Sequence, residues 1–184
     1  MMLARLGGQV ARGGAAVRGL AVAAGQSALP ASPIKLYHRE LDMDSSVLAD
    51  GKSVVVGVPG AFTQVCSQTH IPGFLRKTGE LKAKGVDRVL VVSVNDAHVM
   101  DAWERVLRST VENEDQIPVH FVGDGNAEFS KHLGMDIDLS AVGFGLRCKR
   151  FAMVVDNGKV ASLDVEASPA DHDVSSADNI LTKL

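Results

Sequence analysis

Residues 54–70 of the chain read VVVGVPGAFTQVCSQTH. The β-branched run Val54–Val56 predicts a buried strand, Pro59-Gly60 predicts a turn, and the remainder predicts a helix with Cys66 in its first turn. The first N–H groups of a helix have no partner within it, and this end of the helix dipole is positive. Both features favour the thiolate form of Cys66. Since the thiolate is the nucleophile, the segment predicts redox or covalent thiol chemistry.

The composition is that of one folded domain. The chain has 184 residues, of which 46% are hydrophobic, and a formal net charge of -3. This balance excludes a disordered chain, and it gives no basic surface suited to nucleic acid, so no such partner is expected. No apolar run approaches the roughly 18 residues needed to cross a bilayer, so we expect no membrane segment.

The two cysteines do not read as a disulfide framework or a metal site. Cys66 and Cys148 are 82 positions apart, and neither has a nearby second cysteine of the kind that zinc sites use. We therefore expect no metal. Unpaired thiols of this kind are typical of proteins in a reducing compartment.

The first 32 residues differ from the rest in charge. Before position 35 the charged residues are three arginines: Arg5, Arg12 and Arg18. The first acidic residue is Glu40. An acid-free, arginine-bearing leader of small residues predicts an organellar transit peptide, mitochondrial as our first choice and plastid as our second. The alternative is a disordered tail, with the protein then cytosolic. We assign residues 1–32 to the leader and 33–184 to the folded domain.

Helical and strand patterns alternate through the folded domain. Predicted helices are Thr63–Lys84 with a candidate bend at Pro72-Gly73, Ala97–Arg108, Ala127–Leu133 and Ser176–Leu184. The apolar positions of the second helix are predicted to be Val99, Trp103, Val106 and Leu107. Further strands are predicted at Arg88–Val94, Val119–Val122, Lys149–Val155 and Lys159–Val165. Asn157-Gly158 indicates a hairpin between the last two strands. This order predicts an α/β, thioredoxin-like fold, a central mixed sheet flanked by helices.

Several classes of thiol enzyme do not fit Cys66. Dithiol exchange uses Cys-x-x-Cys, but Thr63 occupies the first position. A cysteine phosphatase needs arginine six positions after the cysteine, where this chain has Pro72. His70 can reach Cys66 as a base, but no hydrolase signature surrounds it, and we favour a helix-packing or solvent-facing residue. Peroxide reduction remains, because the helix start, the Thr63 hydroxyl and a nearby cation can stabilise both the sulfur anion and the leaving oxygen.

The motif Pro59-x-x-x-Thr63-x-x-Cys66 is similar to the peroxiredoxin signature, and residues 57–74 resemble the type II peroxiredoxins of animals and plants. The resemblance continues through Leu81–Val86, Ser93–Asp96, Trp103 and Lys149–Val155, and covers about residues 33–184.

The resemblance implies a role for four residues. Cys66 is the peroxidatic cysteine and cycles between thiolate and sulfenic acid. Thr63 contacts the thiolate and positions peroxide, and Pro59 shapes the pocket. Arg150 holds the thiolate and a peroxide oxygen. The family uses no metal, haem or other cofactor, and its substrates are hydrogen peroxide, small alkyl hydroperoxides and peroxynitrite. It also suggests a homodimer packed through loops beside the site.

The chain departs from the family at the resolving cysteine. Animal members carry it just before the last helix, where this chain has Val174. Many plant members carry it two residues before the serine of the Ser93–Asp96 pattern, where this chain has Val91. Cys148 remains, two residues before Arg150, and if both lie on one strand their side chains share a face. Cys148 is then an unusual intramolecular resolver or, as we favour, a small buried hydrophobe.

We therefore expect a one-cysteine mechanism, in which glutathione with glutaredoxin, or thioredoxin, reduces the sulfenic acid. The alternative is a non-enzymatic peroxide sensor or redox relay, which is oxidised fast but turns over poorly. A thiol-disulfide oxidoreductase is a third possibility, and Thr63 argues against it.

Overall fold

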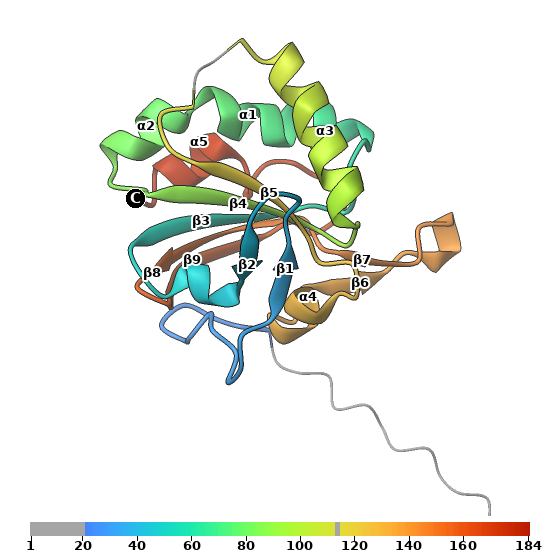
Figure 1. Cartoon of the computed structure of the whole chain (residues 1–184), viewed down its shortest axis with the longest axis horizontal. Helices are drawn as coiled ribbons and strands as arrows, with labels where there is room; N and C mark the ends of the chain where they lie inside the picture. Colours follow the sequence, from blue (N-terminus) through green and yellow to red (C-terminus); the bar gives the residue numbers. More distant parts are fainter. Residues whose placement is uncertain (1–20, 113–114) are drawn as a thin grey trace, which may run out of the picture.

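A seven-stranded mixed sheet forms the middle of the molecule (Figure 1). The computed structural model of the chain describes residues 21–112 and 115–184. The strand order is β2-β1-β5-β4-β3-β8-β9, in which β3, β4 and β5 are parallel and the outer strands pair antiparallel. The strands are β1 (Lys35–Tyr37), β2 (Asp42–Asp44), β3 (Lys52–Gly57), β4 (Arg88–Ser93), β5 (Val119–Gly123), β8 (Phe151–Asp156) and β9 (Lys159–Val165). A separate two-stranded sheet pairs β6 (Asp136–Asp138) with β7 (Leu146–Cys148).

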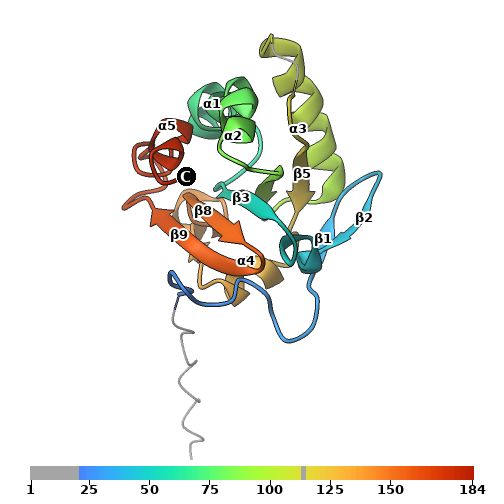
Figure 2. The same ribbon diagram turned by 90° about the vertical axis from the view of Figure 1, so that its left-hand side faces the viewer.

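Helices cover the two faces of the sheet unequally (Figures 1 and 2). The helices are α1 (Ile71–Arg76), α2 (Thr78–Ala83), α3 (Ala97–Thr110), α4 (Glu128–His132) and α5 (Ala177–Leu181). Four of them, α1, α2, α3 and α5, bury their apolar side chains in one core, while α4 and the segment before β1 contribute to the other. This arrangement confirms the predicted thioredoxin-like fold.

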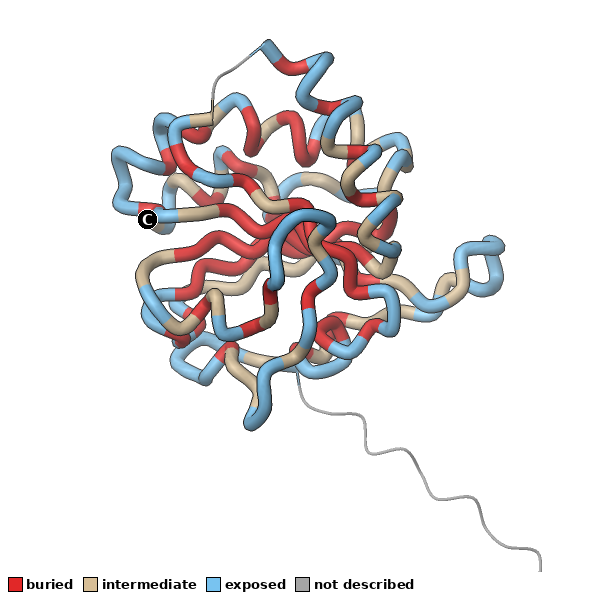
Figure 3. Tube along the Cα trace, in the orientation of Figure 1, coloured by how far each residue is buried: buried red, intermediate tan, exposed pale blue. Residues whose placement is uncertain are grey.

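The central strands are buried on both sides, as Figure 3 shows. Val54 and Val56 of β3 point into the core beneath α1, and Val55 points into the opposite core. Their unbroken β-branched run was the sequence signal for such a strand. The hairpin signal is also confirmed, because β8 and β9 are joined at Asn157 and Gly158, which both have positive φ.

Two local predictions about the helices were wrong. The break in the first helical stretch falls at Lys77, between α1 and α2, and not at Pro72-Gly73. Pro72 is the second residue of α1 and does not interrupt it. In α3, Val106 is 48% exposed, because it is turned about 100° from the buried Leu107. Met100, which the prediction omitted, is buried instead.

Part of the segment before residue 33 packs against the sheet. Ala28 is fully buried in the core, and its N–H donates to the carbonyl of Gly158. Val22 donates to the carbonyl of Leu133. This segment covers the face of the sheet that has few helices, so its small apolar residues serve packing. The leader prediction for residues 1–20 lies outside the described residues.

Candidate active site

The turn after β3 leads directly into the segment that carries Cys66. β3 ends at Gly57, where a side chain would collide with the ring of Phe151: a Cβ there would lie 2.1 Å from Phe151 Cε1. Phe62, in the turn, has a positive φ of 61°. The helix starts at Gln64, so Cys66 lies in its first turn as predicted, and its side chain is fully buried.

Residues Cys66–His70 form a π-helical turn rather than a regular α-helix. The N–H of Ile71 donates to the carbonyl of Cys66 across this wider turn. Such turns are rare and occur frequently at functional sites. The sequence pattern predicted a continuous helix here, since side-chain spacing alone does not distinguish one inserted residue.

Two side chains outside the motif hold the turn in place. Asn95, just after β4, accepts from Ala61 N at 3.1 Å and from the hydroxyl of Ser93 at 2.7 Å, both through its Oδ1. Arg147, on β7, donates from Nη1 to the carbonyl of Pro59 at 3.3 Å. Sequence reasoning gave neither residue a role. Asn95 lies within the quoted Ser93–Asp96 pattern, which was therefore the available signal.

The Thr63 hydroxyl donates to the carbonyl of Gly60 at 2.9 Å. Since a hydroxyl carries one proton and two lone pairs, its oxygen can still accept a hydrogen bond. The carbonyl of Thr63 accepts from Ser67 N at 3.0 Å, and the hydroxyl of Ser67 accepts from Trp103 Nε1 at 3.0 Å. Trp103 on α3 thus anchors the residue next to Cys66.

Arg150 is almost completely buried, although it is charged. Its Nε and Nη2 donate to the carbonyl of Pro169 at 3.1 and 2.8 Å, and its Nη1 donates to His70 Nδ1 at 3.0 Å. A guanidinium has five N–H groups, so three bonds to described residues leave two others available.

His70 must be neutral to accept from Arg150. Its other nitrogen, Nε2, is 3.0 Å from the carbonyl of Ser175, which can only accept, so Nε2 carries the proton and Nδ1 does not. Burial, with a further contribution from the Arg150 charge, lowers the pKa of His70 to about 3. Of the two roles predicted for His70, the structure shows the buried one and not the solvent-facing one, and it adds a polar role as the acceptor that orients Arg150.

One cavity brings three of the four predicted site residues together. It has a volume of about 360 Å³, and Pro59, Thr63 and Arg150 line it. Gln64 and Val65, which directly precede Cys66, line it as well. The remaining wall consists of Leu139, Val142, Phe144, Ser168, Pro169 and Ala170.

Cys148 lies apart from this arrangement. It is fully buried in the core formed with Phe151 and Met153, whereas Cys66 belongs to the core on the other side of the sheet. Cys148 ends β7, which pairs with β6, so Cys148 and Arg150 do not lie on one strand and the condition for a shared face is not met. Burial raises the pKa of the Cys148 thiol to about 12.

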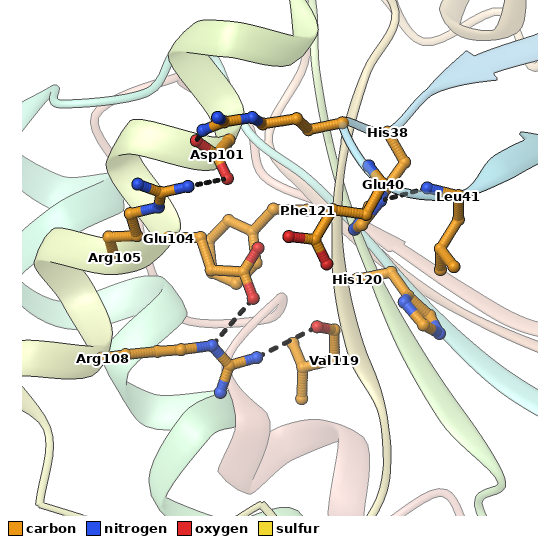
Figure 4. A pocket seen from close by; sticks show the side chains of 11 residues that line it. His38, Glu40, Leu41, Asp101, Glu104, Arg105, Arg108, Val119, His120 and Phe121 are labelled. Atoms are coloured by element: carbon orange, nitrogen blue, oxygen red, sulfur yellow. Dashed lines mark hydrogen bonds and ion pairs between the residues drawn. The ribbon is translucent and has the colours of Figure 1, made fainter.

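A second cavity, of about 390 Å³, lies between the β1–β2 turn, α3 and β5 (Figure 4). Apart from Glu40, its charged side chains pair with one another: Asp101 bridges Arg39 and Arg105, and Glu104 pairs with Arg108. Neither cavity is lined by a cysteine, but the smaller one is lined by Thr63, Gln64 and Val65, which directly precede Cys66.

The described residues contain no group of three or more His, Cys, Asp or Glu side chains placed to hold a metal ion. Within the same residues, no helix is long and apolar enough to span a membrane.

Known proteins share both the sequence and the fold. The model of the Redoxin family matches residues 23–181. Peroxiredoxin-2B of Arabidopsis thaliana is 48% identical over 138 residues, which are 74% of this chain and 81% of that protein. The chain belongs to the type II peroxiredoxins. The mitochondrial Peroxiredoxin-2F of Oryza sativa is 37% identical over 196 aligned residues, covering 98% of this peroxiredoxin and 96% of the rice protein.

A solved structure agrees with this assignment. Reduced Prx3 from Vibrio vulnificus in complex with hydrogen peroxide has a TM-score of 0.74 and 42% identity, covering 89% of this chain and 99% of that one. Peroxiredoxins are thiol-dependent peroxidases, so this protein is an oxidoreductase enzyme, and the predicted peroxidase activity is confirmed.

Proposed function

We propose that Cys66 is the peroxidatic residue. Its thiolate attacks one oxygen of hydrogen peroxide or an alkyl hydroperoxide, so that a sulfur–oxygen bond forms as the oxygen–oxygen bond breaks. The leaving oxygen takes a proton and departs as water or an alcohol, and Cys66 becomes a sulfenic acid. The observation that carries the proposal is the cavity lined by Pro59, Thr63 and Arg150 at the start of the Cys66 helix.

Each lining residue has a role that follows from its contacts. The Thr63 hydroxyl donates its proton to the carbonyl of Gly60, so its oxygen is left to accept a hydrogen bond from a peroxide O–H. The two remaining N–H groups of Arg150 stabilise the sulfur anion and the developing charge on the leaving oxygen. Pro59 excludes water from the sulfur. The apolar wall, with Val142 and Phe144, suits the alkyl group of a hydroperoxide. Peroxynitrite is a further proposed substrate.

The test is peroxide consumption by wild type, Cys66→Ser and Cys148→Ser proteins. We expect Cys66→Ser to lose all turnover, while Cys148→Ser serves as the matched control and retains it. A Cys66→Ser protein that still consumes peroxide contradicts the proposal.

We propose that the sulfenic acid is reduced from outside the chain, by glutathione with glutaredoxin or by thioredoxin. Support comes from Cys148, which lies in the opposite core, and from Val174, which occupies the place of the animal resolving cysteine. Steady-state consumption with glutathione plus glutaredoxin, compared with thioredoxin plus its reductase, identifies the donor. The cellular role is then antioxidant defence and redox homeostasis.

The absence of a cysteine from both family positions for the resolving residue also favours a second candidate function. A non-enzymatic peroxide sensor, relay or scaffold passes its oxidation to a partner thiol through a mixed disulfide. Like the peroxidase, such a protein is oxidised fast at Cys66. Unlike the peroxidase, it turns over slowly with both donor systems. Fast turnover with either donor therefore excludes the relay as the main function.

We propose that the N-terminal segment directs the protein to mitochondria, with a plastid as the alternative. The alignment with rice Peroxiredoxin-2F extends over 98% of this chain and so takes in the arginine-bearing segment. A fusion of residues 1–32 to a fluorescent protein is expected to colocalise with a mitochondrial marker. A diffuse cytosolic signal contradicts the proposal.

A further inference from the structure

We propose that Glu166 is a positioning residue for the peroxidase reaction and acts through Arg150 and His70. Its carboxylate fixes the loop of residues 167–176, whose carbonyl groups hold those two side chains. The inference rests on the proposed role of Arg150 at the reacting sulfur.

Glu166 lies directly after β9, opposite Arg150. Phe151 pairs with Val165 in the β8–β9 ladder, and one step further the N–H of Glu166 donates to the carbonyl of Arg150 at 2.9 Å. The loop that follows leads from β9 to α5, along the edge seen in Figure 2. The Glu166 backbone is therefore tied to the arginine whose guanidinium the loop contacts.

One carboxylate oxygen of Glu166 closes the loop at its far end. Its Oε1 accepts from the N–H of Asp173 at 2.8 Å, from the N–H of Ser175 at 2.8 Å and from the Ser175 hydroxyl at 2.7 Å. Burial raises the pKa of Glu166, but the hydrogen bonds from Ser175 and Asp173 outweigh it and leave the pKa below its usual value. The carboxylate is therefore charged, and hydrogen bonds to a charged acceptor are about twice as strong as neutral ones.

The closed loop presents its carbonyl groups to the active site. The carbonyl of Pro169, within the loop, accepts two hydrogen bonds from Arg150, and the carbonyl of Ser175, at its end, accepts from His70. His70 in turn accepts from Arg150. All three bonds of the guanidinium thus depend, directly or through His70, on where this loop lies. A displaced loop leaves Arg150 charged and buried without its acceptors.

The test is the second-order rate constant for oxidation of Cys66 by hydrogen peroxide, followed by stopped-flow fluorescence of Trp103. Trp103 is the single tryptophan, and its indole N–H bonds to Ser67, next to Cys66. We expect Glu166→Ala to lower the rate about 10- to 100-fold, the loss typical of a misplaced catalytic group. Glu166→Gln keeps an acceptor oxygen and is expected to fall between Glu166→Ala and wild type. Asp171→Ala, an exposed acid in the same loop, is the matched control and should match wild type.

A double-mutant cycle separates positioning from a purely structural role. If Glu166 acts through the guanidinium, Glu166→Ala should have almost no further effect in an Arg150→Lys background. An equal loss in both backgrounds overturns the inference, and so does an unchanged rate in Glu166→Ala. If Glu166→Ala fails to fold, Glu166→Gln carries the same cycle. If the Cys66 of wild type and of Arg150→Lys is oxidised equally slowly, Arg150 does not act at the sulfur. The proposed function then fails, and the inference fails with it.

Discussion

A single neutral imidazole connects the reacting half of the site to its supporting loop. His70 receives a hydrogen bond from a cation on one nitrogen and donates to a backbone carbonyl from the other. One tautomer satisfies both partners, and the protonated form satisfies only the carbonyl. A second proton on His70 would place two donors against each other inside the protein, so the bond to Arg150 requires a pH at which His70 stays neutral.

This requirement predicts a loss of stability in acid. The folded-state pKa of His70, about 3, lies below the ordinary 6.5, so the unfolded chain binds the proton first as pH falls. Stability is complete above about pH 6.5 and is lost progressively toward pH 3, by about 1.4 kcal/mol per pH unit. Urea unfolding at pH 7 and pH 5 measures this slope.

His70→Gln is the control for that slope. The slope of unfolding free energy against pH should be shallower in this variant, by the amount that the uptake of about one proton contributes. Burial also lowers the pKa values of His120 and His172, so a smaller slope of the same sign remains. An identical slope in wild type and His70→Gln contradicts the assignment of a neutral, buried His70.

The second thiol yields a prediction about the product of oxidation. Because Cys148 is buried in the other core and its pKa is raised to about 12, it should not attack a sulfenic acid at Cys66. After one equivalent of peroxide, intact mass of both wild type and Cys148→Ser should show the gain of one oxygen. A loss of two hydrogens in wild type alone would falsify this and make Cys148 the resolver.

At the scale of elements, the Cys66 turn is held by the strand beside it. β4 lies next to β3 in the sheet, and Asn95 at its end ties Ala61 to Ser93. Asn95→Ala leaves both donors without their acceptor, which should cost about 1–3 kcal/mol of unfolding free energy. The rate of Cys66 oxidation should fall with it.

Thermal or urea unfolding together with stopped-flow oxidation tests this prediction, and Asn126→Ala, an exposed asparagine in another turn, is the control. Unchanged stability and rate in Asn95→Ala would show that the turn keeps its shape without this bond.

Elements with a strong local sequence pattern could be predicted. Elements whose conformation depends on contacts with distant parts of the chain could not. The unbroken apolar runs of β3 and β4 and the Asn157-Gly158 turn have signals within the segment itself. The π-helical turn does not, because the spacing of its side chains fits an α-helix equally well. The packing of Ala28 has no local signal either, because the core that buries it forms only when the sheet is assembled.

At the scale of the whole molecule, the fold decides which predicted residues meet. Arg150 is 84 positions from Cys66, and no local pattern marks it; the family resemblance supplied it, and the structure places it in the same cavity as Thr63. Cys148, two residues away from Arg150, is carried to the opposite core because the chain passes from the small sheet to the large one between them. Glu166 acts through backbone carbonyls, which no sequence pattern reveals.

Four of the eight large apolar side chains that are exposed among the described residues lie beside the active-site cavity. Phe62 lies in the turn before Thr63, and Val142, Phe144 and Leu146 lie in and beside the β6–β7 loop; all four are at least 37% exposed. Arg147 joins the two segments, since it donates to the carbonyls of Pro59 and Phe144. Apolar surface of this kind marks an interaction site, and we propose that a second copy of the chain covers it in a homodimer.

Sedimentation velocity tests the homodimer. Wild type should sediment as a dimer, and Phe144→Asp should sediment as a monomer, because the dimer would bury an unpaired carboxylate. Val106→Asp places the same charge on an equally exposed valine of α3, outside this surface, and should remain dimeric. A wild-type monomer, or a dimer that Val106→Asp dissociates and Phe144→Asp does not, rules out this face. Val142 and Phe144 also line the cavity. Relative to wild type, Phe144→Asp should therefore slow the reaction with bulky alkyl hydroperoxides more than the reaction with hydrogen peroxide.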